Sequence, residues 1–501
     1  MDSFSLLLQG FETAFTWWNL LYCLIGVSIG MFIGVLPGLG PVSGTALLLP
    51  LTFGLEPVSA IIMLSGIFYG AMYGGTITSV LINVPGEAAS VITCIDGHQL
   101  ARQGRAGVAL GISAIGSFIG GIVAVVALTF VGPHLSAFAL RFGPPEFFSI
   151  MTLGMLMIVA LMGKSLARGL IAAAIGLFLS VVGLDSVTGE MRFTFGQAEL
   201  LDGIDFSVLA MGLFGISEIL LNAENISKMD KPAKIKGLLP RREEWKPSLK
   251  AITRGTGIGM ILGLIPGANS VIASTFSYTL EKKIAKDPTR FGKGAIEGVA
   301  GPETANNAHS GAALIPLFTL GLPSSPTMAI ILGAFIMHGL TPGPALFQSN
   351  PDFVWGVIAS MFIGNVLLLI MNMPLVGMWA KIAMVPYKLL FPLVLIIILV
   401  GTYSMATSLF DVVLMLIFGV LGYIMKKLDI PIAAMIVTFM LGTQMESSLL
   451  QSLSISQNGF WIFFTRPISA TIMVITLIIL ILSIISGIKN KRSMLADDVE
   501  M

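Results

Sequence analysis

The sequence predicts an all-α, polytopic membrane protein with ten to twelve transmembrane helices, in which re-entrant hairpins and broken helices form two repeats of inverted orientation. Hydrophobic residues make up 55% of the 501 residues and charged residues only 11%, which is far from the composition of soluble domains. Apolar segments close to the ~20 residues needed to cross a bilayer recur along the whole chain. A glycine-rich motif also occurs twice, which indicates an internal duplication.

The first observation, the apolar segments, gives the predicted elements in order. Those with about the length of a transmembrane helix are 17–36, 57–82, 107–131, 147–162, 168–184, 205–222, 351–373, 390–408, 409–425, 430–445 and 465–487. Other apolar segments are too short to cross a bilayer alone, so we expect them to be arms of hairpins or halves of broken helices. These shorter segments are 43–55, 268–280, 310–322 and 324–337.

The second observation is the duplication itself. Residues 26–38 and 255–267 match at 7 of 13 positions, and each copy has a glycine at every fourth position before a Pro-Gly pair. A helix that stops within the membrane leaves backbone groups without partners, at a cost of several kcal/mol each, unless protein, water or a ligand satisfies them. Interrupted helices at corresponding places in two halves are therefore the best sequence indication of a transporter binding site.

A second pair of breaks supports the duplication. Residues 82–90 contain another Pro-Gly pair and correspond to residues 320–327 in the second half. The offset between the halves is 238 residues here and 229 at the first pair of breaks. Nine residues are therefore inserted in the second half, and we expect them within the polar stretch 281–307.

The distribution of charge predicts the domain organisation. Residues 224–254 contain nine basic and four acidic residues, and loops rich in Lys and Arg stay on the cytoplasmic side. A second basic loop, 281–293, places both ends of the hairpin at 255–280 on that side, whereas the hairpin at about 24–55 has only acidic flanks and is expected to enter from the opposite face. The predicted parts are a first transmembrane half at 1–222, a basic cytoplasmic linker at 223–254, a second transmembrane half at 255–488 and a cytoplasmic tail at 489–501.

Several function classes find no support in the sequence. The net charge of +1 gives no sign of a nucleic-acid partner. Cys23 and Cys94 are the two cysteines, and they form neither a disulfide framework nor a metal-binding pattern. Because no phosphate-binding loop and no catalytic motif is present, we expect no enzymatic activity and no cofactor. Any transport then depends on an ion gradient or on passive flow.

The Pro-Gly corners are predicted to shape the tips of the hairpins and of the broken helices. Proline removes a backbone donor and ends the first arm, and glycine permits a positive φ. The small residues that follow leave the N-terminus of the next helix accessible, where it attracts anions. The alternative interpretation is simple glycine packing of a kinked membrane helix. The predicted tip residues are Pro37, Gly38, Gly40, Pro85, Pro266, Gly267 and Pro323.

Polar residues beside these breaks are the candidates for contacts with a substrate or an ion. Hydroxyls and amides at a broken helix suit a carboxylate, and backbone carbonyls freed near Gly38 and Gly267 suit Na⁺. For any single Ser or Thr the alternative is a hydrogen bond to its own helix. The candidates are Asn83, Gly86, Glu87, Ser90, Asn269, Ser270, Ser324 and Ser325.

A polar stretch at 298–311 contains the candidates for cation coupling. It places Glu303, Asn307 and His309 directly before an apolar segment, and the first two share one face if the stretch is helical. Because an ionisable group at membrane depth is costly and marks function, these residues are candidates for coupling to Na⁺ or H⁺. The alternative is an exposed loop that caps the next helix. Glu218 is expected at the membrane interface and has no assigned role.

Seven motifs spread over nearly the whole chain carry a resemblance to a known family. They are Leu-Pro-Gly-Leu-Gly-Pro at 36–41, Tyr-Gly-Ala-Met-Tyr-Gly-Gly at 69–75, Asn-Val-Pro-Gly-Glu-Ala-Ala-Ser at 83–90, Arg-Gln-Gly-Arg-Ala-Gly at 102–107, Pro-Glu-Thr-Ala-Asn-Asn-Ala at 302–308, His-Gly-Leu-Thr-Pro-Gly-Pro at 338–344 and Arg-Pro-Ile at 466–468. With these motifs the chain closely resembles the TctA family, the large membrane subunit of bacterial tripartite tricarboxylate transporters.

The resemblance implies a symporter of the bacterial inner membrane, surrounded by membrane lipid, that takes a carboxylate substrate from a periplasmic solute-binding protein and works with a small four-helix membrane subunit. Coupling to Na⁺ or H⁺ and an elevator-like motion are implied by similar transporter folds. The chain departs from the usual family pattern at Asn269, Ser270 and Ser324, and it has Leu450 where an arginine is common. These added polar groups lie at predicted binding tips, so they bear on which carboxylate is bound. The alternatives are an anion channel or carrier that needs no binding protein, and an intramembrane enzyme.

Overall fold

Long apolar helices packed side by side make up the fold, as the composition predicts. The computed structural model describes residues 3–36, 38–162, 165–185, 189–224, 235, 237–383, 385 and 387–497. Within these residues, nine helical runs are long and apolar enough to cross a membrane, which confirms the all-α polytopic fold class. They are α2 (Trp17–Val35), α4 (Pro57–Ile82), α6 (Ala106–Ala139), α7 (Pro144–Met162), the continuous run of α9 (Phe206–Ala210), η4 (Met211–Ile216) and α10 (Ser217–Glu224), α17 (Pro351–Asn372), α20 (Leu409–Lys427), α21 (Ile432–Ile455) and α23 (Pro467–Asp497).

The difference between nine and the predicted ten to twelve lies in two helices. The predicted spans 168–184 and 390–408 correspond to α8 (Leu166–Ser180) and α19 (Tyr387–Ala406), whose apolar described parts are shorter than the others. The smaller elements are α1 (Ser3–Ala14), η1 (Leu49–Thr52), η3 (Ala198–Leu200), η5 (Arg242–Glu244), η6 (Pro288–Arg290), α16 (Leu346–Ser349), α18 (Val376–Ile382), η7 (Gly459–Trp461), α22 (Ile462–Thr465) and the antiparallel pair β1 (Gly183–Leu184) and β2 (Met191–Arg192).

The two glycine-rich copies make equivalent helix contacts. In the first half α2 packs against α4, and in the second half α11 (Trp245–Gly263) packs against α13 (Glu297–Ala312). A Cβ on Gly26, Gly30 or Gly34 would lie only 2.2–2.4 Å from a carbonyl oxygen of α4. On the second copy, Gly255 and Gly259 would be 2.3 Å from carbonyl oxygens of α13. The absence of side chains therefore lets the backbones touch, as small-residue membrane interfaces do.

The register of these contacts agrees with the predicted insertion. Gly30 faces Ile67, which is 37 residues further along the chain, whereas Gly259 faces Ala305, which is 46 residues further. The difference of nine residues equals the insertion predicted from the two pairs of breaks. In the structure it falls between the end of the second hairpin and the start of α13.

Both predicted hairpins are present. The chain reverses between α2 and α3 (Gly40–Leu48), and again between α11 and α12 (Ser270–Ile284). Gly38 has a φ of +94° and Gly267 a φ of +85°, a left-handed backbone that glycine adopts without strain. Pro37 lies outside the described residues.

Both predicted helix breaks are present as well. After α4, Asn83 is left-handed with a φ of 56°, and the chain continues through η2 (Ala88–Ser90) into α5 (Val91–Arg102). In the second half, α14 (Leu314–Leu320) ends at the left-handed Gly321 and is followed by α15 (Pro326–Met337).

The predicted segment 310–322 is part of a broken helix, and this helix already begins within the polar stretch before it. Helix α13 covers 297–312 and leads almost directly into α14, so the polar stretch at 298–311 is helical and fully buried. Its polar side chains face protein and not lipid, and for that reason hydropathy gives no sign of this helix. The alternative of an exposed capping loop is therefore excluded.

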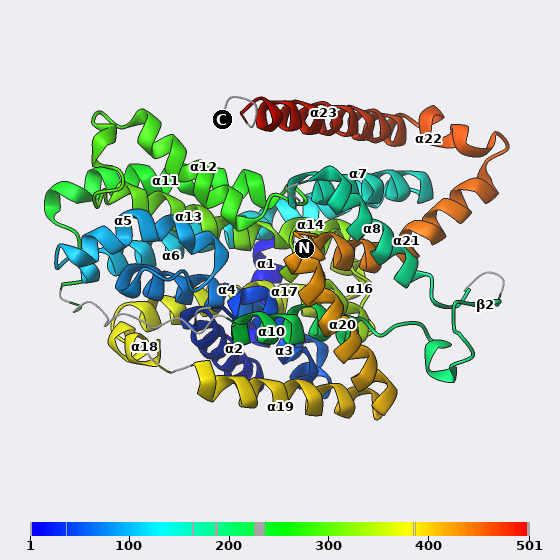
Figure 1. Cartoon of the computed structure of the whole chain (residues 1–501), viewed down its shortest axis with the longest axis horizontal. Coiled ribbons are helices and arrows are strands. Elements are labelled where there is room, and N and C mark those ends of the chain that lie inside the picture. The colour runs from blue at the N-terminus through cyan, green and yellow to red at the C-terminus, as the bar shows by residue number, and fades with distance from the viewer. Residues whose placement is uncertain are drawn as a thin grey trace.

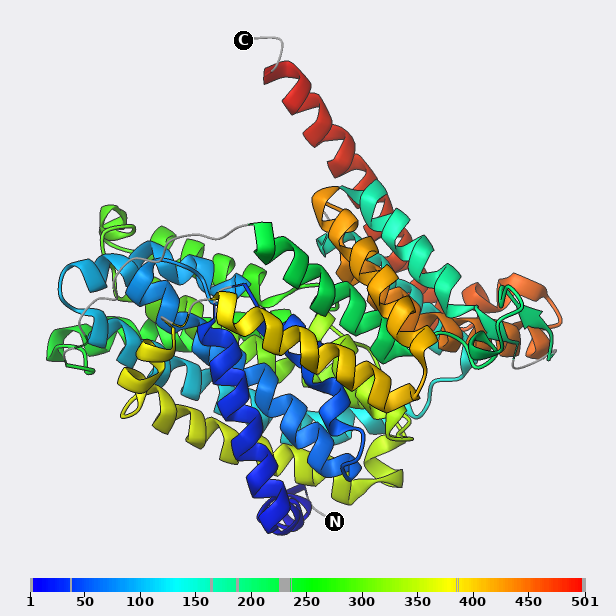
Figure 2. The ribbon, with the colours of Figure 1, turned by 60° about the horizontal axis from the view of Figure 1, so that its bottom comes forward.

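The outer helices form two groups, each of which mixes residues from both predicted halves. The first arm consists of α7, α8, α21, α22 and α23, which pack against one another. The second arm consists of α9, η4, α10, α19 and α20. Figure 1 shows the first arm at upper right and α19 along the lower edge, and Figure 2 shows α23 projecting away from the other helices. The remaining helices form a central body, and the boundaries of the two halves stay a prediction.

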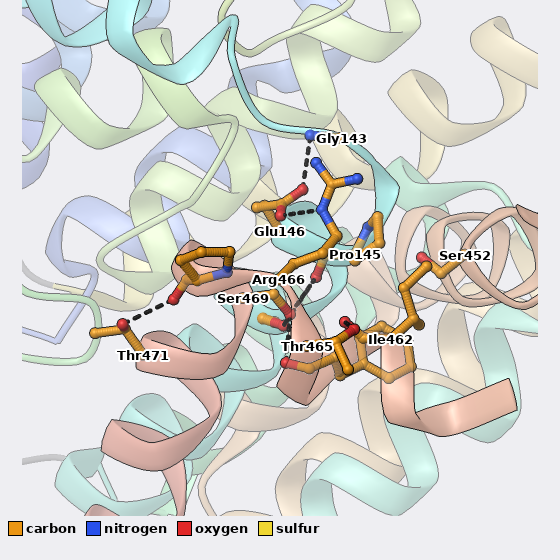
Figure 3. Close-up of polar contacts among 12 residues, drawn as sticks. Gly143, Pro145, Glu146, Ser452, Ile462, Thr465, Arg466, Ser469 and Thr471 are labelled. Atoms are coloured by element: carbon orange, nitrogen blue, oxygen red, sulfur yellow. Dashed lines mark hydrogen bonds and ion pairs between the residues drawn. The ribbon is translucent and has the colours of Figure 1, made fainter. Parts of the chain in front are cut away.

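A motif near the end of the chain holds the first arm together (Figure 3). Glu146 of α7 is buried, and its carboxylate accepts hydrogen bonds from Arg466 Nε at 2.6 Å and from the backbone N–H of Gly143 at 2.9 Å. The hydroxyls of Ser149 and Ser469 are 2.8 Å apart. The Arg-Pro motif thus fixes the start of α23 against α7.

The described end of the predicted linker is tied to the central body. Arg105 donates to both carboxylate oxygens of Glu244 at 2.6 Å, directly before α11 begins. Burial is the largest single effect and opposes the charged form of Glu244, but the hydrogen bonds and positive charges of Arg105 and Arg241 together outweigh it and hold the pKa of Glu244 below its ordinary value. Most of the linker residues between 225 and 236 lie outside the described residues.

Candidate functional site

A cavity of about 420 Å³ forms where hairpin tips and helix breaks from both halves converge. The first half contributes residues 38–43 and 85–88, and the second half contributes residues 269–271 and 325–327. Of the predicted site residues, those in the cavity wall are Gly38, Gly40, Pro85, Gly86, Glu87, Asn269, Ser270, Ser325 and His309. Sequence positions more than 280 residues apart thus meet at one place.

The break of the first half supplies a buried carboxylate. Glu87 is the N-cap of η2 and accepts a hydrogen bond from the backbone N–H of Ala89 at 2.7 Å. Its other oxygen accepts from Asn306 of α13 at 3.0 Å. A Cβ on Gly86 would lie 2.0 Å from the carbonyl oxygen of Gly34, so only glycine lets this break close onto the first hairpin.

The second half supplies two helix N-termini. Asn269 caps α12 by accepting from the N–H of Ile272 at 3.1 Å, and Ser325 caps α15 by accepting from the N–H of Met328 at 3.3 Å. Both capping residues lie in the cavity wall. Their helices therefore direct partial positive charge toward the cavity, which favours an anion there.

Other predicted contacts lie outside the wall. Asn83 is exposed to solvent. Ser90 is buried and hydrogen-bonds to Ser79 at 2.9 Å, behind Glu87. Ser324 is buried, and its carbonyl accepts from the N–H of Gly267 at 3.0 Å, which joins the second hairpin tip to the second break. Two tip prolines, Pro266 and Pro323, shape the turns without lining the cavity.

The candidates for coupling share helix α13 but differ in position. Glu303 is buried, and its carboxylate accepts from the hydroxyls of Thr76, at 2.6 Å, and Thr93. Asn307 donates to Ser117 at 2.8 Å. His309 alone reaches the cavity wall, where its ring bonds the carbonyl oxygen of Ala268.

Glu303 joins the two halves through a polar cluster without a counter-charge. Its two threonine partners come from α4 and α5 of the first half, while Glu303 itself belongs to the second half. Among the described residues no basic side chain lies within ion-pair distance of it. The amide oxygen of Asn307, one helical turn away, is buried and has no hydrogen-bond partner within the part of the chain that the structure describes. A proton or a cation would neutralise a carboxylate that is buried in such surroundings.

Two further cavity residues were not found from the sequence. Glu218 of α10 and Lys426 of α20 line the cavity and form an ion pair of 2.5 Å. Each lies near the end of an ordinary apolar span, and no local motif marks either one. Only the packing of α20 against the run of α9, η4 and α10 brings them together.

Within the described residues there is no group of three or more His, Cys, Asp or Glu side chains that could hold a metal ion. The carbonyl oxygen of Gly38, one of the predicted Na⁺ ligands, accepts from Asn222 Nδ2 at 3.1 Å. Ligation of Na⁺ by carbonyls near Gly38 and Gly267 stays a prediction.

Comparisons with known proteins agree with the motif resemblance. A sequence profile described as the tripartite tricarboxylate transporter TctA family matches residues 20–437. The chain is 45% identical over 493 residues, 98% of each chain, to an uncharacterized 52.8 kDa protein in the TAR-I ttuC' 3' region of Agrobacterium vitis. It is also 45% identical over 234 residues to an uncharacterized protein in the TAR-II ttuC' 3' region of the same organism. That alignment covers 47% of this chain and 97% of the other protein.

No solved structure matches the chain. Because the profile spans most of the chain, from the first hairpin to α21, this multi-pass membrane protein belongs to the TctA family of tripartite tricarboxylate transporters.

Proposed function

We propose that the chain is the large membrane subunit of a secondary transporter that imports a di- or tricarboxylate by cation symport across the bacterial inner membrane. Its partners in this proposal are a periplasmic solute-binding protein and a small four-helix membrane subunit, which the family's tripartite composition supports. The observation that carries the proposal is the cavity that the interrupted helices of both halves line together.

The cavity wall suits a carboxylate. Asn269, Ser270 and Ser325 supply amide and hydroxyl groups at two helix N-termini. Such neutral donors, together with the helix dipoles, stabilise the negative charge of a bound carboxylate. They do so without the cost of burying a basic side chain completely. Since the first two of these residues depart from the usual family pattern, they are the positions at which we expect substrate preference to be set.

The buried carboxylate of Glu303 is the candidate for cation coupling. Its hydroxyl partners and the free amide oxygen of Asn307 are oxygen ligands of the kind that Na⁺ accepts, and the carboxylate can alternatively take up a proton. The division into a central body and two arms supports an elevator-like motion in which the tips move with the body. Hairpin tips from both halves would then carry substrate and cation together.

Transport by membrane vesicles tests this function. Radiolabelled di- or tricarboxylates are added outside vesicles that contain both membrane subunits. Uptake is measured with and without the binding protein, and with and without a Na⁺ or a proton gradient. We expect saturable accumulation that needs the binding protein and one of the two gradients. Uptake that saturates poorly and proceeds without the binding protein would instead indicate the channel or carrier alternative.

A further inference from the structure

We propose that Lys426 is the cationic contact for a substrate carboxylate, and that Glu218 holds the Lys426 ammonium in the empty cavity and competes with the substrate for it. This inference rests on the proposed function and deepens it, because it assigns the charged part of substrate recognition to the second arm. Both residues lie outside all the motifs that relate the chain to its family.

The position of Lys426 is the first observation. Of the described residues that line the cavity, it is the only Lys or Arg. Its Nζ lies 2.5 Å from Glu218 Oε2, and the side chains are 25% and 21% exposed. Lys426 therefore borders the same cavity as the two helix N-termini of the second half, so a carboxylate bound there has both the ammonium and the helix ends as available partners.

The neighbouring residue provides a contrast within the same helical turn. Lys427 forms an ion pair of the same 2.5 Å length with Glu224, but these side chains are 48% and 41% exposed and neither lines the cavity. Exposed pairs of this kind contribute little to stability. If an ordinary pair between the two helices were all that the packing needed, Lys427 and Glu224 would already supply it.

The chemistry of the pair permits exchange. An ammonium group has three donors, of which Glu218 Oε2 uses one. A substrate carboxylate can therefore bond the ammonium beside Glu218 or in its place. Glu218 Oε1 also accepts from Asn222 at 3.3 Å, and the same amide donates to the carbonyl of Gly38 in the first hairpin tip. Glu218 thus keeps a neutral partner when the ammonium turns to the substrate.

Three matched variants test the inference in cells that produce the complete tripartite system. The probe is whichever radiolabelled acid of a panel of C4–C6 di- and tricarboxylates the wild type accumulates. Lys426→Gln should raise the KM for uptake at least about tenfold, since it removes a charge-assisted hydrogen bond. Lys426→Arg should retain most of the affinity, and Lys427→Gln should transport like the wild type.

Glu218→Gln separates a recognition role from a structural one. Because it removes the competing anion and leaves the ammonium in place, we expect the KM to fall severalfold. If the pair only braced α10 against α20, Glu218→Gln and Lys426→Gln would instead impair transport in the same direction.

A chemical rescue covers the case in which Lys426→Gln does not reach the membrane. Lys426→Cys, treated with an aminoethyl thiol reagent that restores a positive charge, should regain uptake, whereas a neutral reagent of the same size should not. Equal rescue by both reagents, or equal KM values for Lys426→Gln and Lys427→Gln, overturns the inference while the proposed function stands. Failure of the wild type to accumulate any acid of the panel overturns both.

Discussion

Gly267 is the residue on which the second hairpin tip depends. It has a φ of +85°, and a Cβ there would lie 2.9 Å from both the Cα of Ile158 and the carbonyl oxygen of Met157 in α7. Gly267→Leu therefore meets a left-handed penalty of about 1–2 kcal/mol and a backbone clash. We expect this variant to lose carboxylate uptake while it remains in the membrane, as measured by uptake and by the amount of membrane-bound protein.

The matched control is Gly257→Leu on the same hairpin. A Cβ at Gly257 meets no atom within 4 Å, so we expect uptake close to that of the wild type. Unchanged uptake by the Gly267 variant would remove this tip from the mechanism.

The carboxylate of Asp96, a residue of the first half, accepts hydrogen bonds from the second half. It is fully buried in α5, and one of its oxygens accepts from the N–H groups of Gly292, Gly294 and Ala295 at 2.7–2.9 Å. The other oxygen accepts from the hydroxyl of Tyr278 at 2.9 Å. Asp96→Asn replaces an acceptor by a donor at one of these positions, so we expect a loss of about 1.5–3 kcal/mol. A clearly lower unfolding temperature in detergent is the readout.

Tyr278→Phe removes only one of these four hydrogen bonds and keeps the charge. It should lower the unfolding temperature less than Asp96→Asn does. Equal effects of the two variants would show that the three backbone amides contribute nothing measurable.

At the scale of elements, the glycine stripes set the distance between paired helices. A Cβ on Gly259 would lie 2.3 Å from the carbonyl oxygen of Ala305, so α11 and α13 must separate to accept even a methyl group. We expect Gly259→Ala to destabilise the protein by about 1–3 kcal/mol. Gly257→Ala, two residues away on the open face, should be neutral or slightly stabilising because alanine favours a helix. Thermal unfolding of the two purified variants compares them directly.

The contact between α7 and the start of α23 gives a prediction about a partly buried ion pair. Arg466→Ala removes the cationic partner of the buried Glu146 carboxylate and leaves its hydrogen bond from the N–H of Gly143. The expected cost is about 1–3 kcal/mol. Arg168→Ala breaks an exposed pair of 3.5 Å between α8 and Asp429, which follows α20, and should cost about 0–1 kcal/mol. If chemical unfolding gave the two variants equal stability, the Arg-Pro motif would have no bracing role.

The sequence predicted the individual helices better than it predicted which helices pack against one another. Apolar length located the spans, and the three Pro-Gly corners together with Pro323-Ser324 located both hairpins and both breaks, because lipid contact and backbone chemistry are local properties. Helix α13 was missed as a helix because its polar side chains are satisfied inside the protein. Lys426 was missed because its role depends on the packing of two helices about 200 residues apart, which leaves no local pattern.

For the whole molecule, the central question is how two halves act as one transporter. Glu87 with Asn306, Glu303 with Thr76, and Asp96 with the loop before α13 are polar contacts from one half to the other within the central body. The arms also combine helices of both halves. A motion of the central body against the arms would preserve these contacts while the hairpin tips change the side on which they are exposed.

The proposed coupling step involves the molecule as a whole, since Glu303 from the second half is held by threonines of the first. Glu303→Gln keeps the shape but removes the charge that a proton or Na⁺ would neutralise. We expect this variant to lower accumulation against the substrate gradient at least about tenfold, because coupling energies of 1–3 kcal/mol correspond to roughly 5- to 150-fold changes in binding. Glu297 lies on the same helix as Glu303 and forms an ion pair with Arg290. Glu297→Gln removes this pair and should accumulate substrate normally. Vesicle uptake with and without the cation gradient distinguishes the two, and normal gradient-driven accumulation by Glu303→Gln would exclude this carboxylate from coupling.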